Sequence, residues 1–223
     1  MQFGQNLLLP ILAQTGVMFY PIGKMVKLPD ELYFELCKRF KSMSIVLEEV
    51  VPGLQLKVRE ISMTQDDDGD NIHKVELLAV RNGRELPLRC ESDGVRKLIS
   101  TLSLLIAVYN HRSVTVAYDE FDSGIFEYLL GEILQVLQSS GKGQFIFTSH
   151  NMRPLEVLDR NYVWFTSTDP DNRYIRINGL SGTNNLRKVY YREITLQEHY
   201  DNLYSETKRN KIISAMRKAG GED

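Results

Sequence analysis

One stretch of the chain constrains the fold more than any other: residues 114–120, which read VTVAYDE. Residues 114–118 are apolar or favour β-structure, so we expect a buried strand there. Two adjacent carboxylates, Asp119 and Glu120, follow at its carboxyl end. Ligands bind at that edge of open α/β sheets. Such a run can also simply end a strand at a solvated loop, so its meaning depends on the neighbouring segments.

The segments around this strand predict a parallel core sheet. A helix with a broad apolar face is expected from Gly94 to Tyr109, and another over 125–137. Residues 144–148, QFIFT, predict a second buried strand. Because helices and short apolar strands alternate, the strands should lie parallel between helical layers.

The first third of the chain predicts a helix followed by an antiparallel sheet. Apolar residues recur every three or four positions over 30–50, with Asp30 as the expected N-cap. Residues 54–89 read as strands, with a hairpin turn at Asn82-Gly83. The acidic loop 65–71 lacks the glycine and glutamate spacing of a calcium loop, so a solvated hairpin tip is expected.

The two ends of the chain give weaker patterns. Residues 1–28 are apolar but interrupted by Pro and Gly, and they are interpreted as an irregular connector. Further strands are expected at 161–165 and 173–177, and a polar helix with a basic end over 195–218.

Bulk composition excludes several classes of protein. The net charge of −2 over 223 residues does not indicate nucleic-acid binding by the whole chain. The two cysteines have no metal-type or disulfide spacing, which favours a reducing, cytoplasmic setting. No apolar run approaches the roughly 18 residues that would span a bilayer, and the N-terminus reads poorly as a signal peptide.

A candidate anion site precedes the first core helix. Ser92, Gly94 and the first amides of the following helix combine unpaired N–H groups with the positive end of the helix dipole. Lys97, in the first turn, would add positive charge. A phosphate group is the expected ligand.

Candidate hydrolytic residues follow the two core strands. Asp119 would hold Mg²⁺ through water, and Glu120 would orient or deprotonate an attacking water. His150, after the second strand, would hydrogen-bond a terminal phosphate. An apolar strand that ends in two such carboxylates is the arrangement of a Walker B strand in a nucleotide hydrolase.

Three segments together carry a family resemblance: ESDGVRKLI, SVTVAYDEFDSGIFEYLLGEIL and GKGQFIFTSHNMRPLEVL. They resemble the signature motif, the Walker B region and the switch-histidine region of the C-terminal lobe of ABC-type, SMC-like ATPases. The similarity is greatest to the AAA15/OLD-like ATPases of prokaryotic defence and repair. It covers residues 85–165 well and 30–84 loosely.

The resemblance implies a P-loop NTPase-like α/β lobe with a mainly parallel core sheet, flanking helices and an antiparallel edge. It also implies ATP and Mg²⁺ as cofactors. In this family two lobes face each other, and the signature motif of one closes on ATP held by the Walker A motif of the other. The expected partner is therefore a second copy or a Walker A-bearing polypeptide, with DNA or an effector protein as a further possibility.

The chain departs from the family pattern in important ways. No Walker A of the form G-x-x-x-x-G-K-[ST] occurs in the 223 residues. Asp93 stands where the signature motif commonly has glycine, and the D-loop carboxylate cannot be assigned. The first lobe is interpreted as missing, through truncation, degeneration or division between two chains.

Two functions remain open from the sequence. The first is an ATPase lobe, inactive alone and active when complemented by a Walker A lobe. The second is a non-catalytic remnant that serves as an interaction scaffold. In either case we expect a connector over 1–29, the lobe over 30–190 and a helical tail over 191–223.

Overall fold

The computed structural model describes residues 7–13, 16–167, 169–176, 186–196 and 208–221. The chain divides into two compact units, residues 1–154 and 155–223. This division falls inside the lobe expected over 30–190, whose boundaries remain a prediction. None of the described helices combines the length and apolar character needed to cross a membrane.

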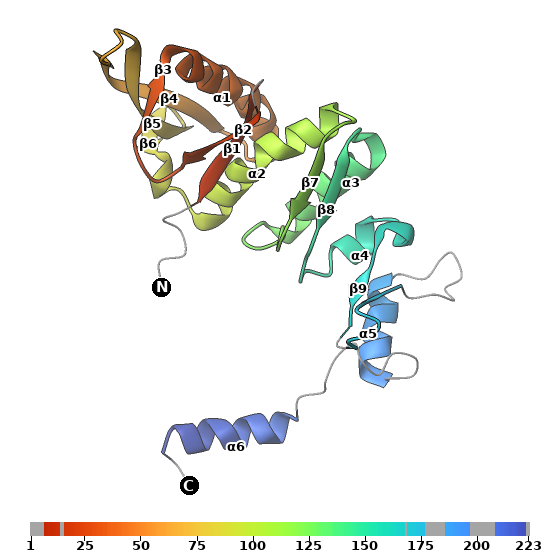
Figure 1. The fold of residues 1–223 in the computed structure, drawn as a ribbon. Helices are drawn as coiled ribbons and strands as arrows, with labels where there is room; N and C mark the ends of the chain where they lie inside the picture. The colour runs from red at the N-terminus through yellow and green to blue at the C-terminus, as the bar shows by residue number, and fades with distance from the viewer. Residues whose placement is uncertain (1–6, 14–15, 168, 177–185, 197–207, 222–223) are drawn as a thin grey trace. The chain divides into compact units, whose positions relative to one another are not determined.

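An antiparallel sheet and one long helix form the first half of unit 1 (Figure 1). The strand order is β3 (Val26–Pro29), β5 (Asn71–Arg81), β4 (Leu54–Gln65), and β6 (Arg84–Pro87) also pairs with β5. Helix α1 (Asp30–Val50) buries one apolar stripe in the core, formed by Leu36, Phe40, Met43 and Leu47. The expected helix and antiparallel sheet are both present.

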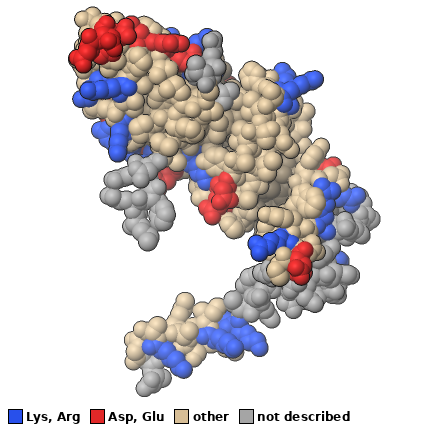
Figure 2. Space-filling view, in the orientation of Figure 1, with Lys and Arg blue, Asp and Glu red and all other residues tan. Residues whose placement is uncertain are grey.

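Turns in this sheet follow the expected chemistry. Asn82 and Gly83, between β5 and β6, have φ angles of 49° and 76°, as a two-residue hairpin turn requires. Residues 66–70 form the tip of the β4–β5 hairpin. Figure 2 shows acidic side chains gathered at this tip.

The expected start of α1 was only partly right. The helix begins at Asp30, but Pro29 is its N-cap residue, and no side chain caps it. The Asp30 carboxylate instead accepts a hydrogen bond from the Asn71 side chain at 3.0 Å and pairs with His73. The Asp30 carboxylate therefore bonds to side chains of β5 and not to the backbone amides of its own helix.

The prediction that residues 1–28 are irregular was wrong. β1 (Leu8–Ala13) and β2 (Gly16–Pro21) form an antiparallel hairpin. Its inward residues Leu9, Ile11 and Tyr20 are at most 4% exposed. Gly16, the first residue of β2, has a φ of 134°, which glycine adopts readily and residues with a side chain rarely do.

The second half of unit 1 contains the two core strands. Helix α2 (Asp93–Asn110) leads to β7 (Thr115–Tyr118), and helix α3 (Glu127–Ser140) leads to β8 (Gln144–Phe147). β7 and β8 are parallel, in register from Thr115 with Gln144 to Tyr118 with Phe147. The helix–strand order expected from the sequence is confirmed.

This parallel sheet is smaller and more open than expected. Among the described residues it has only two strands, whereas the antiparallel sheet has four. One face packs inward through Val116, Tyr118, Phe145 and Phe147, but the other face, with Thr115, Ala117, Gln144 and Ile146, is exposed. The expectation of a strand buried on both faces was therefore wrong, because helices cover only one side. The mixed α/β class holds, while a mainly parallel core is only partly confirmed.

Unit 2 contains short elements around a small core. A short helix, α4 (Pro154–Val157), spans the junction, and the 3₁₀ turn η2 (Arg160–Tyr162) precedes the antiparallel pair β9 (Phe165–Thr166) and β10 (Tyr174–Ile175). Helix α5 (Leu186–Leu196) buries Leu186 against Phe165 and Ile175. Helix α6 (Arg209–Ala219) has no buried residue. The strands expected at 161–165 and 173–177 are each reduced to two residues, and residues 197–207 of the expected tail helix lie outside the described chain.

Candidate functional site

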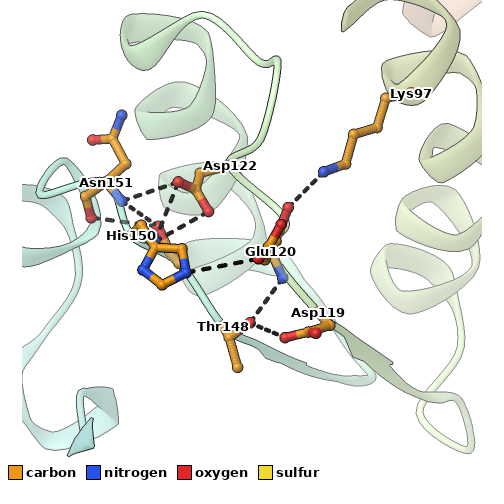
Figure 3. A network of polar contacts seen from close by, with 8 residues as sticks. Lys97, Asp119, Glu120, Asp122, Thr148, His150 and Asn151 are labelled. Carbon is orange, nitrogen blue, oxygen red and sulfur yellow. Dashed lines mark hydrogen bonds and ion pairs between the residues drawn. The ribbon is translucent and has the colours of Figure 1, made fainter. Parts of the chain in front are cut away.

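The polar site lies where β7 and β8 end. The N–H of Thr148 donates to the carbonyl of Tyr118 at 3.1 Å, and the N–H of Phe121 donates to the carbonyl of Thr148 at 3.0 Å. These bonds extend the strand pairing past Asp119 and Glu120. Because the strands are parallel, both polar ends meet at one edge (Figure 3).

Glu120 is held in a conformation that few non-glycine residues adopt. Its φ is 49°, in the left-handed region. The next residue, Phe121, is fully buried and packs edge-to-face on Tyr118, Phe145 and Phe147, with centroid distances of 5.9, 5.0 and 5.8 Å. Burial of this ring fixes the loop, so the Glu120 carboxylate is directed outward. Strained residues of this kind concentrate at functional sites.

The predicted pair Glu120 and His150 lies together. The His150 Nε2 is 3.8 Å from the Glu120 Oε1, and both side chains are open to solvent, 86% and 57% exposed. Asp119 precedes them at the end of β7 and is also exposed. Two carboxylates and an imidazole therefore share one accessible edge.

Thr148 connects the two strand ends, a role that sequence reasoning missed. Its Oγ1 accepts a hydrogen bond from the N–H of Glu120 at 2.8 Å and donates to the carboxylate of Asp119. One hydroxyl thus orients both acidic residues. A hydroxyl residue directly before Ser149-His150 was the only signal in the sequence.

Asp122 is a second residue that the sequence analysis did not identify. Its carboxylate accepts the backbone N–H of His150 at 3.2 Å and that of Asn151 at 3.0 Å. The loop after β7 therefore holds the loop after β8 in place. A third acidic residue shortly after Asp119 and Glu120 could have suggested this.

Helix α2 reaches the same edge through Lys97. Its Nζ donates to the backbone carbonyl of Glu120 at 2.5 Å and lies 5.7 Å from the centre of the Tyr118 ring. Burial lowers the pKa of Lys97, and the nearby carboxylates, with Asp122 first, partly oppose this. Its positive charge is directed at the acidic loop of its own chain.

The start of α2 packs closely on the same loop. A Cβ on Gly94 would overlap the backbone carbonyl oxygen of Gly124, so only glycine fits there. Ser92 caps the helix, its Oγ accepting the N–H of Val95 at 3.3 Å. Asp93, the departure from the signature pattern, pairs with Arg96. Gly94 and Lys97 thus contact the loop after β7, while Ser92 caps the start of their helix.

The oxygen groups at this edge suit a hard divalent cation. Carboxylate and hydroxyl oxygens are preferred ligands of Mg²⁺, which usually retains several waters. The described residues contain no group of three or more His, Cys, Asp or Glu side chains that could hold a metal. Because Mg²⁺ accepts one carboxylate with several waters, the exposed Asp119 carboxylate fits such a role without further protein ligands.

Comparison with solved structures shows the fold. The chain resembles an SMC ATPase from work on ATP-driven dimerization and DNA-stimulated activation, with TM-score 0.50 and 14% identity, covering 75% of this chain and 97% of that one. It also resembles the Smc head domain with a coiled coil and joint from Pyrococcus yayanosii, with TM-score 0.50 and 14% identity, covering 73% of this chain.

The chain spans 30% of the length of that Smc head and 38% of an SmcHead bound to the C-winged helix domain of ScpA. The latter match has TM-score 0.40, 14% identity and 55% coverage of this chain, and no conclusion rests on it. No protein-family model and no curated protein matches the sequence. The two matches with TM-score 0.50 show that the chain has the ABC-type fold of SMC ATPase heads.

Proposed function

We propose that this chain is the lobe of an SMC-like ATPase that supplies the signature motif, the Walker B carboxylates and the switch histidine, within the AAA15/OLD-like branch. The observation that carries the proposal is the meeting of Glu120 and His150 at the ends of two parallel strands. The left-handed φ of Glu120 adds weight, because a buried Phe121 maintains it.

Each residue has a role in this proposal. Asp119 holds Mg²⁺ through water, and the ion neutralises phosphate charge when bound. Glu120 orients the attacking water, and His150 hydrogen-bonds the terminal phosphate. Thr148 positions the Asp119 carboxylate and the Glu120 backbone through its hydroxyl.

The start of α2 supplies the anion site of the proposal. Ser92, Gly94 and Lys97 would face the phosphates of a nucleotide bound by the opposing lobe. Lys97 also donates to the Glu120 carbonyl, so this helix is joined to the hydrolytic loop of its own chain. A nucleotide that displaces this helix would therefore also displace the loop that carries Glu120.

In this proposal the phosphate cradle comes from a Walker A motif outside these 223 residues, which contain none. Exposed apolar side chains offer a surface for docking: Leu8, Val17 and Phe19 on the β1–β2 hairpin are 46%, 44% and 61% exposed, and Ile146 on β8 is 52% exposed. We propose a homodimer or a Walker A-bearing polypeptide as the partner. In this proposal residues 1–29 connect to that lobe, 30–190 form the present lobe, 191–223 form a tail, and the assembly acts in cytoplasmic DNA repair or phage defence.

The test is ATP hydrolysis by the chain co-expressed with the product of the neighbouring upstream reading frame. The complex should hydrolyse ATP, and Glu120→Gln should abolish turnover while prolonging ATP-dependent association. Glu132→Gln, an exposed change on α3, is the matched control and should have no effect. Equal hydrolysis by the Glu120→Gln and wild-type complexes would refute the assignment.

The second candidate function is a scaffold module that does not hydrolyse ATP. The exposed apolar face of the β1–β2 hairpin favours it, because such faces mark interaction surfaces. Calorimetric titration of the isolated chain with Mg-ATP separates the two. Micromolar binding by the chain alone would count against the scaffold, since a lobe without a phosphate cradle should bind weakly.

A further inference from the structure

Helix α6 exposes an apolar stripe along one side. Ile212, Ile213 and Met216 are 44%, 41% and 71% exposed, and no residue of this helix is buried. With 3.6 residues per turn, these three side chains lie within about 100° of the helix circumference. We call them the α6 stripe. Apolar residues grouped on one side of a helix usually pack against another surface.

The charges of α6 are all positive. The helix and its N-cap residue contain five cations and no acidic residue: Lys208, Arg209, Lys211, Arg217 and Lys218. The nearest acidic residues in the sequence, Glu206 and Glu222, lie outside the helix. Among the described residues, no ion pair involves any of the five cations. A surface that covers the α6 stripe should therefore be apolar at its centre and acidic at its rim.

The far end of the β4–β5 hairpin has an apolar centre of this kind. The register of β4 with β5 shifts between Glu60 and Ser62, which leaves Ile61 as an extra residue. Because side chains alternate along the strand from there, Ile61 and Met63 share one face. They are 44% and 54% exposed.

Helix α1 adds an aromatic ring to this face. Phe34 is 63% exposed, and the centre of its ring lies 6.2 Å from that of His73. His73 is the residue directly opposite Met63. We call Phe34, Ile61 and Met63 the ribbon patch. Its members come from two elements of unit 1 that pack on each other, α1 and β4.

The hairpin tip next to the ribbon patch is acidic. Its four aspartates are Asp66, Asp67, Asp68 and Asp70. No ion pair in the described part of the chain involves them. Lys74, the one Lys or Arg in residues 60–75, alternates with His73 along β5, so it lies on the other face of the sheet. The ribbon patch and the tip therefore complement α6 in both polarity and charge.

We propose that α6 of one copy of this chain docks on the ribbon patch of a second copy, with Arg209 and Arg217 near the aspartates of the tip. Arg209 lies within the arc of the α6 stripe, and Arg217 lies beside it. The 11 residues of α6 rise about 16 Å, and the strand from Ile61 to Asp66 extends about 17 Å, so the two surfaces match in length. Two copies that exchange helices form two equivalent contacts about a twofold axis.

The ribbon patch favours this occupant over other partners of α6. An anionic membrane or a nucleic acid would neutralise the cations of α6, but it would be repelled by the aspartates and would leave the ribbon patch exposed. Two α6 helices packed on each other would bring ten cations together. Docking on the second copy covers both apolar surfaces and places opposite charges side by side.

Sedimentation velocity of the full chain tests the proposal. Neither surface includes the residues at the ends of β7 and β8, so the proposal is independent of ATP hydrolysis and the experiment uses no nucleotide. We expect a reversible dimer over about 1–100 μM, because a contact of this size is weak. Dimerisation should weaken as salt rises, since salt screens exposed charges.

Two charge reversals assign the contact. The helix variant combines Arg209→Glu with Arg217→Glu, and the tip variant combines Asp67→Lys with Asp68→Lys. Asp66 is retained because its carboxylate holds the turn, accepting the N–H of Asp68 at 3.1 Å. Each variant alone should dimerise about tenfold more weakly than the wild type. A mixture of the two should recover association, because one helix and one tip then meet in their wild-type form.

Arg112→Glu with Lys142→Glu is the matched control. Both residues are exposed and lie in loops outside the two surfaces, and this variant changes the net charge by the same amount as the helix variant. It should dimerise like the wild type. Circular dichroism of each variant verifies folding.

Five results would overturn the proposal. The wild-type chain stays monomeric at low salt, or it dimerises equally well in both reversed variants, which would place the contact on another surface. The control loses as much affinity as the helix variant, which would reduce the effect to net charge. The mixture of helix and tip variants stays monomeric. A monomeric chain binds vesicles that contain anionic lipid, and the helix variant does not, which would identify a membrane as the partner of α6.

Discussion

Replacing Gly94 by alanine tests the close contact between α2 and the loop after Glu120. The added Cβ would overlap the backbone oxygen of Gly124, and backbone cannot move aside as a flexible side chain can. Overpacking of this kind costs about 1–3 kcal/mol. Alanine recovers up to about 1 kcal/mol of helix propensity. We therefore expect a net loss of stability of up to about 3 kcal/mol.

Gly131→Ala is the matched control in α3. There the new Cβ would meet the side chain of Arg153, with its Nε 2.6 Å away, and that long side chain can shift. Alanine in mid-helix should then be neutral or stabilise by up to about 1 kcal/mol. The two substitutions are chemically identical, so their difference reports the rigidity of the neighbouring atom.

Native-state hydrogen exchange at the amides of α2 measures the effect locally. Gly94→Ala should speed exchange at the start of α2 and in the loop around Gly124, and Gly131→Ala should not. In the complemented ATPase, displacement of that loop by about 1 Å should reduce turnover by about a hundredfold. If both variants exchange at the wild-type rate, the close packing described for Gly94 is refuted.

Three further substitutions test the rest of unit 1. Leu47→Ala, in the core under the sheet, should cost about 2–5 kcal/mol in urea unfolding, and a cost below about 1 kcal/mol would contradict its burial. The hydrogen bond to Asp30 raises the pKa of His73, so the stability it adds is complete below about pH 6.5 and is lost as pH rises through the raised value. The stability difference between wild type and His73→Gln should therefore shrink at high pH, and a difference that grows would exclude this pairing. Asp122→Ala should speed hydrogen exchange at the amide of His150, whereas unchanged exchange would show that the carboxylate does not hold the loop.

The local sequence pattern was sufficient to predict the main helices and the parallel strands β7 and β8 of unit 1. The three- or four-residue periodicity of 30–50 predicted α1, and the apolar run before Asp119 predicted β7. Such patterns depend only on residues that are close in the sequence, so they can be recognised without knowledge of the fold. The β1–β2 hairpin was not predicted because proline and glycine usually interrupt strands. Pro10, Gly16 and Pro21 nevertheless lie within the paired strands.

The sequence by itself determined which residues could carry chemistry: Asp119, Glu120 and His150 stand at strand ends, and Ser92 and Gly94 at a helix start. Only the tertiary structure decided how they are held. The register of β7 with β8 places the Thr148 hydroxyl on both acidic residues, and the buried ring of Phe121 turns Glu120 outward. These contacts join residues far apart in sequence, so no local pattern could specify them. The carboxylate pair that first indicated an α/β edge is thus oriented by contacts that exist only in the folded chain.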